Sequence, residues 1–434
     1  MIPKLTASTI YSTLGNNSSL IPLGIKDVAN SCGLTTASYL AGDKNEGKDR
    51  FIDEFGTQAI WLGGLPTFKY ILGKALCAPK KFDYKIDARI LNDSDILKAA
   101  QEFAPTQDIK SAIEHVAKNA KTYKAITMVK FVGATVLTAA SYFGLTKFRH
   151  KYIENQIEKE YTQKHKSNKN KNTRQIPFSS SFSQVHSPKE VSFTGIQNFM
   201  FDPVQNLMLV DGVITGERFT HSRNSQDFMG YVVKEGSFWF FMYYAGQKIA
   251  SMLEKQAETK HNKSIDLDAR VIESEELKKA FSDGSIRKHL DAFKSADTSN
   301  VDIYKFAVKS DTKNLVIDMA KKSDIVPLLK LSWSKKSDKV DTRKYIDLEK
   351  LRGVQSKMEK LLTQYEMSGQ TVDEFFKQLR KLKRSSVLKN IGACIGALGV
   401  IAPSIMLLMR KLSANSEYQV KKDIEAKLAK NSYS

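Results

Sequence analysis

Cysteine is scarce in this chain of 434 residues, with only Cys32, Cys77 and Cys394. The three share no spacing typical of metal ligands, and an odd, scattered set is not a disulfide framework. A reducing compartment is therefore expected. The first twenty residues hold one lysine and no continuous apolar core, so we expect no cleavable signal peptide.

Motifs of catalysis are also missing. The seven histidines show no HxxxH or HExxH spacing, and the chain has no GxSxG turn, no CxxC pair and no phosphate loop ending in Gly-Lys-Ser or Gly-Lys-Thr. Nothing in the sequence therefore indicates a metal, a cofactor or a catalytic site, and we expect a protein that is not an enzyme.

Basic residues outnumber acidic ones. Lys and Arg total 67 against 47 Asp and Glu, which gives a net charge of +20. A charge of this size attracts polyanions such as anionic lipid, nucleic acid or an acidic partner, without selecting among them. The mean hydropathy of -0.35 excludes a mostly apolar, polytopic transporter, because the apolar residues are confined to a few blocks.

Three pairs of similar segments occur in the same order. KIDARILNDSDILKAAQEF aligns with DLDARVIESEELKKAFSDG 181 residues later, which pairs Asp87 and Arg89 with Asp268 and Arg270. Upstream of each copy lies an aromatic block with a tryptophan, at an offset of 180. Downstream, VKFVGA matches LKNIGA at an offset of 259, which implies about 78 extra residues in the second copy. The order predicts an internal duplication.

The fold class predicted is all-α, with two tandem related helical units, hydrophobic membrane-associated helices and a disordered basic linker. The predicted divisions are an N-terminal tail (1–24), repeat one (25–148), the Ser/Asn/Lys-rich linker (149–200), repeat two (201–412, with an insertion at about 283–366) and a polar tail (413–434). Within the insertion we expect helices at 314–330 and 346–366, separated by a loop.

One apolar run has the length of a membrane helix. Ile391 to Met409 is an uncharged run of 19 residues, close to the number needed to cross a ~30 Å hydrocarbon layer. Gly392, Gly396 and Gly399 would let another helix approach closely. The alternative is a buried central helix of a soluble bundle. The matching run in repeat one, 131–146, is shorter and more polar.

The two aromatic blocks are weaker membrane candidates. The first contains Trp61, and the second contains the run FWFFMYY. Tryptophan and tyrosine favour the headgroup boundary of a bilayer, so these blocks are expected to be interfacial or re-entrant helices; ordinary core helices are the alternative. The interfacial aromatic residues predicted are Trp61, Phe238, Trp239, Phe240, Phe241, Tyr243 and Tyr244.

Basic residues bracket the strongest apolar run. These residues are the predicted contacts to anionic lipid headgroups, and they are Arg380, Lys381, Lys383, Arg384, Lys389, Arg410 and Lys411. The repeated Asp-Ala-Arg has two interpretations: Arg89 and Arg270 hold a headgroup, or each arginine pairs with its own aspartate. The structural interpretation is favoured, because no catalytic partners accompany the motif.

The leading functional hypothesis is a non-enzymatic, membrane-associated scaffold that binds an anionic membrane surface, with its polar regions on the cytoplasmic side. One rival is a small channel or transport protein formed by parallel repeats, although the apolar runs contain no acid, histidine or paired charge. The other is a soluble helical protein whose basic linker binds nucleic acid. Homo-oligomerisation is left open. The linker's basic residues are Lys164, Lys166, Lys169, Lys171 and Arg174.

Overall fold

The computed structural model describes residues 7–15, 20–165, 199–309, 311–332, 335–412 and 418–433. The described chain is almost entirely helical, which confirms the all-α fold class, apart from one short hairpin. It divides into two compact units, each assembled from three separate segments. Unit 1 comprises 1–23, 67–134 and 241–394, and unit 2 comprises 24–66, 135–240 and 395–434. These units do not follow the predicted repeat boundaries, since each draws on both halves of the sequence.

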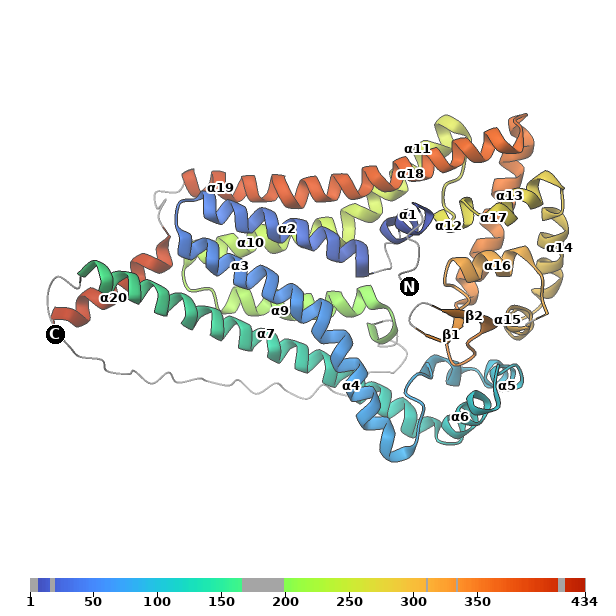
Figure 1. Ribbon diagram of the computed structural model, residues 1–434, viewed down its shortest axis with the longest axis horizontal. Helices are drawn as coiled ribbons and strands as arrows, with labels where there is room; N and C mark the ends of the chain where they lie inside the picture. Colours follow the sequence, from blue (N-terminus) through green and yellow to red (C-terminus); the bar gives the residue numbers. More distant parts are fainter. Residues whose placement is uncertain are drawn as a thin grey trace. The chain divides into compact units, whose positions relative to one another are not determined.

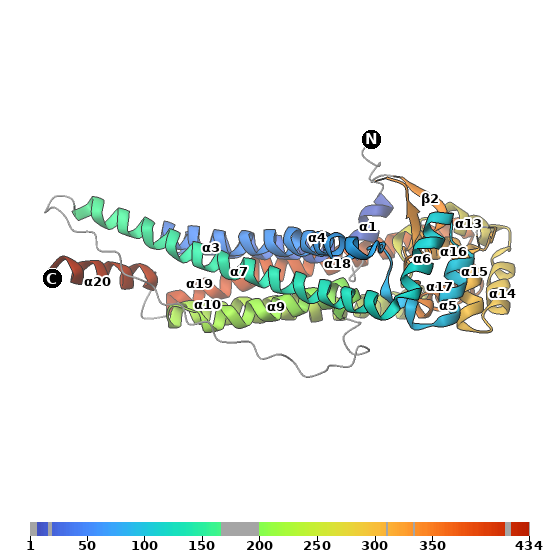
Figure 2. The same ribbon diagram turned by 90° about the horizontal axis from the view of Figure 1, so that it is seen from below.

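Unit 2 is a bundle of long helices. α2, α3, the C-terminal part of α7, α9, α10 and α19 run side by side in both views (Figure 1, Figure 2). Its elements are α2 (Leu20–Leu40), α3 (Lys44–Gln58), η1 (Ala59–Gly64), α7 (Ala120–His165), α9 (Pro203–Thr220), α10 (Ser225–Trp239), η5 (Ala397–Ile401), α19 (Ala402–Leu412) and α20 (Gln419–Tyr433). Asp43, Asp202 and Asn224 cap α3, α9 and α10 by accepting hydrogen bonds from backbone N–H groups of the first turn.

Unit 1 consists of shorter helices around an aliphatic and aromatic core. The elements are α1 (Ala7–Gly15), α4 (Leu65–Cys77), η2 (Ala78–Lys80), η3 (Ala88–Asn92), α5 (Ser94–Glu102), α6 (Gln107–Lys118), the first part of α7, η4 (Phe240–Ala245), α11 (Gly246–His261), α12 (Ala269–Ile272), α13 (Glu275–Ser282), α14 (Ile286–Ala296), α15 (Asn300–Val308), α16 (Leu315–Lys322), α17 (Leu348–Ser368) and α18 (Val372–Gly396). Phe281, Tyr365, Phe375 and Phe376 pack edge to face there.

The insertion differs from its prediction. The first expected helix, 314–330, ends at Lys322 as α16, and a two-stranded antiparallel hairpin follows, β1 (Leu328–Lys330) and β2 (Lys336–Val340). Leu328 pairs with Val340 and Lys330 with Lys336. The prediction was wrong here because such short strands, rich in Lys, Ser and Asp, carry almost no apolar alternation. The second expected helix is α17.

The linker prediction was wrong at its start. Residues 149–165 continue α7, because Ile153 and Ile157 are fully buried against Tyr418 and Val420. Burial of this apolar stripe outweighs the polar composition on the rest of the helix surface. Residues 166–198, with Lys166, Lys169, Lys171 and Arg174, lie outside the described residues.

Several elements recur at one spacing of 181 residues. The N-caps Asp43 and Asn224, the π-helices η1 and η4, and the N-caps Asp87 and Asp268 are separated by this interval. So are the N-caps Asp93 of α5 and Ser274 of α13. The sequence had paired the aromatic blocks at 180 through two glycines, whereas the helical elements that contain them are offset by 181.

The predicted apolar run Ile391 to Met409 is helical throughout, as the end of α18, η5 and most of α19. Only Gly399 among its three candidate packing glycines approaches another helix: a Cβ there would lie 3.2 Å from the carbonyl oxygen of Ala29. Cβ atoms at Gly392 and Gly396 would meet nothing within 4 Å. Their expected packing role against this chain was therefore wrong, because they face away from its other helices.

Replacement of Gly33 should reveal how tightly α2 packs on η5. A Cβ at Gly33 would lie 2.3 Å from the Gly399 carbonyl oxygen, so Gly33→Leu must displace backbone and should cost about 1–3 kcal/mol or more. The matched control, Gly396→Leu, meets no neighbour. Thermal unfolding of the full chain in detergent, followed by helical circular dichroism, compares the two. Equal unfolding temperatures would contradict this packing.

Candidate functional site

Unit 2 contains a cluster of buried ionised side chains, which we call the ionic core. Four helices contribute: α3, α7, α9 and α10. Each member's side chain is between 2% and 11% exposed. Four are acids and four are bases, so the formal charges balance. The members are Asp49, Arg50, Asp53, Glu54, Arg149, Arg218, Lys234 and Glu235.

Asp53 on α3 is the centre of the ionic core. Its Oδ1 lies 3.0 Å from NH1 of Arg149 on α7 and 3.3 Å from NH2 of Arg218 on α9. The hydroxyl of Tyr142 donates to the same oxygen at 3.4 Å. Charge-assisted contacts of this kind are strong where water is excluded. One carboxylate therefore ties together three helices of the bundle.

α10 completes the ionic core through two adjacent residues. Lys234 Nζ lies 2.8 Å from Oε1 of Glu54, and Arg218 donates to Glu235. Glu235 also accepts a hydrogen bond from the hydroxyl of Thr215 at 2.9 Å. Burying an ion without a partner is prohibitively costly, so this mutual pairing is what permits the burial.

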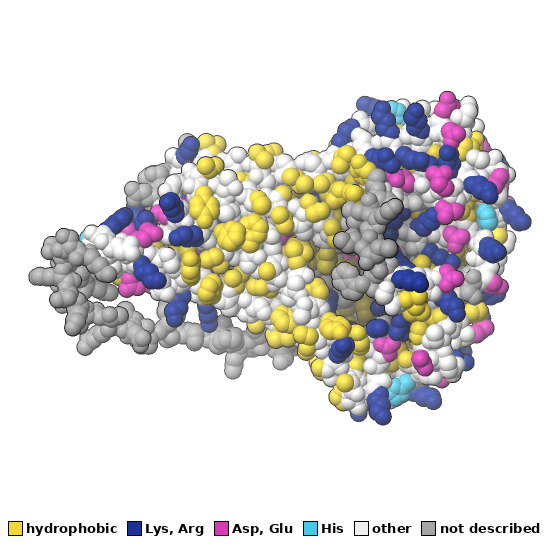
Figure 3. All heavy atoms as spheres, in the orientation of Figure 1, with side chains coloured by type: hydrophobic (Ala, Val, Ile, Leu, Met, Phe, Trp, Pro, Cys, Tyr) yellow, Lys and Arg dark blue, Asp and Glu magenta, His cyan; other side chains and the backbone are white. Residues whose placement is uncertain are grey.

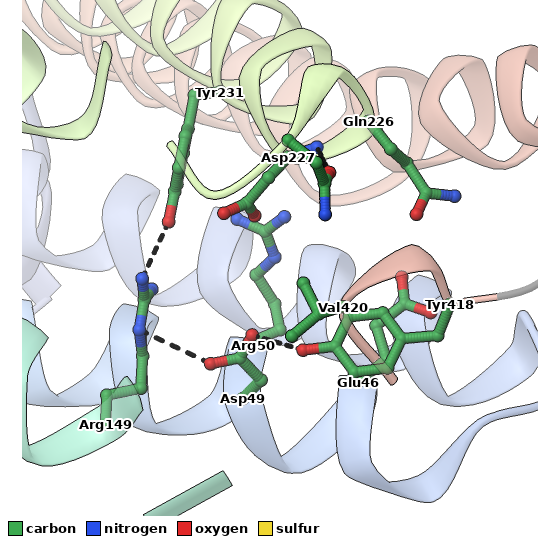
Figure 4. Close-up of a pocket in the computed structure, with 10 residues that line it drawn as sticks. Glu46, Asp49, Arg50, Arg149, Gln226, Asp227, Tyr231, Tyr418 and Val420 are labelled. Atoms are coloured by element: carbon green, nitrogen blue, oxygen red, sulfur yellow. Dashed lines mark hydrogen bonds and ion pairs between the residues drawn. The ribbon is translucent and has the colours of Figure 1, made fainter. Parts of the chain in front are cut away.

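A polar layer continues from Asp49 towards α20, and Figure 4 shows it closely. Arg149 contacts Asp49 at 3.3 Å and donates to the Tyr231 hydroxyl at 2.9 Å. The hydroxyl of Tyr418 donates to Asp49 at 2.7 Å, and Arg223 donates to the same carboxylate at 2.6 Å. The adjoining cavity is about 40 Å³, and a second one beside Glu54 and Lys234 is about 20 Å³. Each has room for only a few waters.

The outside of unit 2 is apolar, the reverse of its interior. Figure 3 shows mainly hydrophobic and uncharged side chains over the long helices on the face in view. Large apolar side chains at least half exposed in this unit are Leu40, Phe51, Val136, Phe148, Phe240, Val400, Ile401 and Leu408. Soluble proteins rarely expose extended apolar surface, so this pattern is typical of a face that contacts lipid or a partner.

The predicted aromatic residues divide between the interior and the surface. Trp61 is only 2% exposed and its indole N–H donates to Asp27 at 2.9 Å, so its interfacial role was wrong. Its polar atom finds a buried carboxylate in place of a headgroup. Phe238 and Tyr243 are also buried, Trp239 and Phe241 are partly buried, and Phe240 and Tyr244 are half exposed.

The predicted lipid-contacting cations are likewise divided. Lys381, Lys389 and Lys411 are exposed. Lys383 donates to the backbone oxygen of Ile265 at 2.6 Å, Arg384 pairs with Glu273 at 2.8 Å, and Arg410 pairs with Glu46. Arg380 lies 3.5 Å from Glu275. About half of the predicted set is therefore engaged with acids or carbonyls of the chain itself.

The Asp-Ala-Arg motif is a local cap in both places. Asp87 accepts from the backbone N–H of Arg89 at 3.0 Å and from its guanidinium at 2.7 Å, and Asp268 binds Arg270 in the same way. Asp341 and Arg343, outside the repeated segments, form the same pairing at 2.9 Å. The motif thus has the structural geometry favoured from the sequence, and that geometry does not depend on duplication.

Sequence reasoning missed the ionic core. Its acids occur in KNEGKDRFIDEFGTQ, which has the composition of a solvated helix, and Arg149 had been assigned to the linker. One signal was present: Asp49 with Asp53, and Arg50 with Glu54, form two adjacent i, i+4 pairs on one helix. Among the described residues, no group of three or more His, Cys, Asp and Glu side chains could hold a metal ion.

Substitution of Asp53 tests whether the ionic core holds unit 2 together. Asp53→Asn keeps the size but leaves Arg149 and Arg218 without their shared carboxylate, which should cost about 3–5 kcal/mol. The control is Asp95→Asn, in an exposed pair with Lys98, which should cost less than about 1 kcal/mol. Denaturant unfolding of the detergent-solubilised chain measures both, and similar losses would refute the central role of Asp53.

Comparison with known proteins gives no relative from which to transfer a function: no family model, curated protein or solved structure matches this chain. The proposals below therefore depend on the geometry of the two units.

Proposed function

We propose that this chain is a membrane-embedded, non-enzymatic scaffold whose unit 2 lies in the lipid bilayer. The observation that carries the proposal is the inverted distribution in unit 2, with charges inside and apolar side chains outside. In hydrocarbon, exposed apolar surface is stable, whereas ionised groups must face the interior and pair with one another.

Two helices support this placement. Ala120–His165 and Val372–Lys411 are long and apolar enough to cross a membrane, with mean hydropathies of 1.4 and 2.2 in their most apolar windows. Only 28% and 33% of those windows are buried within the chain. A core helix of a soluble bundle passes the same length test but is mostly buried, so the low burial favours lipid contact.

The balance of the ionic core favours a scaffold. Four acids and four bases satisfy one another, and the cavities beside them are about 40 and 20 Å³. A set of fully paired charges fixes which helices meet and in which register. We also propose that the polar parts lie on the cytoplasmic side, where Lys- and Arg-rich segments are retained.

The proposal includes the internal duplication. The common spacing of 181 residues for helix caps and π-helices supports it, as does the pairing of two buried glutamates, Glu54 and Glu235, at the same interval. Unrelated segments have no reason to share N-caps, a helix length and a π-helix at one offset.

Thiol labelling tests the lipid placement. Val136 and Val400 are 57% and 62% exposed, on the two candidate spans. In a background lacking the native cysteines, Val136→Cys and Val400→Cys should react with a membrane-impermeant maleimide at least tenfold more slowly in intact membranes than after denaturation. The control Lys288→Cys, on the exposed surface of α14, should react equally in both. Rapid labelling of all three in membranes would exclude lipid burial.

Transport is the second candidate, because buried acids inside an apolar bundle often mark ion or proton pathways. The exclusion drawn from sequence was incomplete: it considered only the apolar runs, whereas Asp27 and Glu54 come from other helices of the bundle.

A flux assay separates the two candidates. Proteoliposomes loaded with a pH- or potassium-sensitive dye should leak no faster than protein-free liposomes if the chain is a scaffold. A flux above that background, abolished by Asp27→Asn, would identify transport. The amide of this variant can still accept the hydrogen bond from Trp61, so the fold should be retained.

A further inference from the structure

A groove in unit 1 has the charge and size of an anion site. It has a volume of about 550 Å³, within the range of small-molecule sites. Lys278 of α13 lines it together with residues of α18, namely Asp373, Lys377, Arg380, Lys381 and Arg384. α13 is held at its N-terminus by Lys322, whose hydrogen bond to Glu276 lowers the pKa of that carboxyl to about 2.

Two cations of the groove have no acidic partner in the described parts of the chain. Lys278 pairs with Asp373, Arg384 with Glu273, and Arg380 lies 3.5 Å from Glu275. Lys377 and Lys381 are exposed, form no ion pair with a described residue, and stand one turn apart on α18. Five cations against three acids leave a surplus of two positive charges.

Arg380 provides an independent sign of a missing ligand. Its Nε and one terminal nitrogen are shielded from solvent and form no hydrogen bond within the described structure. Buried donors are nearly always satisfied, and an unsatisfied pair indicates an absent water or ion. The planar guanidinium donates two parallel hydrogen bonds to phosphate or carboxylate, and here it stands beside two lysines that carry uncompensated charge.

We propose that this groove binds a phosphate monoester, the headgroup of an anionic lipid of the phosphatidic acid class. A phosphate monoester carries between one and two negative charges near neutral pH, which matches the surplus. Arg384 precedes the apolar run at Ile391 by seven residues, roughly 10 Å along a helix, which is the distance at which headgroups border the hydrocarbon. The lipid source of the phosphate rests on the proposed membrane function, whereas the phosphate chemistry does not.

The test uses the full chain in neutral detergent, so that binding does not depend on insertion into a bilayer. The probes are short-chain phosphatidic acid, short-chain phosphatidylserine, short-chain phosphatidylcholine, inorganic pyrophosphate and a 20-base-pair duplex DNA, each followed by calorimetric titration at two salt concentrations. Phosphatidic acid should bind at least tenfold more tightly than the other two lipids. It should also bind more tightly than pyrophosphate, because only the lipid adds apolar contacts.

The double variant Lys377→Gln/Lys381→Gln should weaken phosphatidic acid binding at least tenfold without changing the unfolding temperature, because both side chains are exposed. Arg380→Lys, which keeps the charge but loses the fork, should weaken it severalfold. The matched control Lys255→Gln/Lys260→Gln removes two exposed charges from α11 and should change affinity less than twofold.

Three results would overturn the proposal. Equal losses in the α11 control would mean that only net charge matters. Pyrophosphate binding as tight as that of phosphatidic acid would assign the groove to a soluble phosphate, and tighter binding of DNA would favour nucleic acid. Because the titration is done in detergent, a failure here leaves the thiol labelling result unaffected, and failed membrane burial would leave phosphate binding in the groove intact.

Discussion

The pairing of Asp53 with Arg149 and Arg218 is the constraint on which unit 2 depends. A carboxylate that is almost completely shielded from solvent cannot stay ionised without cations, and the cations come from α7 and α9. Those arginines must in turn be compensated, which is why Glu235 and Lys234 of α10 are buried beside them. The positions of four helices follow from one closed set of charges. Apolar packing, such as that of Gly33 on Gly399, then fixes the remaining distances.

This arrangement explains why the exterior of the bundle is apolar. Each helix of unit 2 has a polar stripe that faces the ionic core, so the opposite side is left for the surroundings. In water such a protein would expose large apolar areas, whereas in lipid the same areas are stable. Unit 1 is organised in the usual way, with Phe281, Phe375 and Phe376 inside and charged side chains outside. The two units therefore differ in the solvent that each one's surface suits.

The sequence was informative where side-chain periodicity is strong. The helix over Ile391–Met409 and the caps at Asp87 and Asp268 could be predicted from apolar length and local hydrogen bonding. The ionic core could not, because its members are separated by up to 186 residues and nothing local distinguishes a buried Asp53 from an exposed Asp95. The hairpin at 328–340 was missed because its strands are short and polar. In the basic groove, Lys381 was predicted, but Lys278 and Lys377 required the tertiary arrangement.

The ionic core also has a consequence for how the chain can be made. Of its eight members, the first half of the sequence supplies Asp49, Arg50, Asp53, Glu54 and Arg149, with a net charge of -1. The second half supplies Arg218, Lys234 and Glu235, with a net charge of +1. Neither half is neutral without the other, so an isolated half would have to bury an unmatched ion or leave its helices apart. The two halves are thus obligate partners in one chain, and during synthesis the first must wait for α9 and α10 before its interior can close.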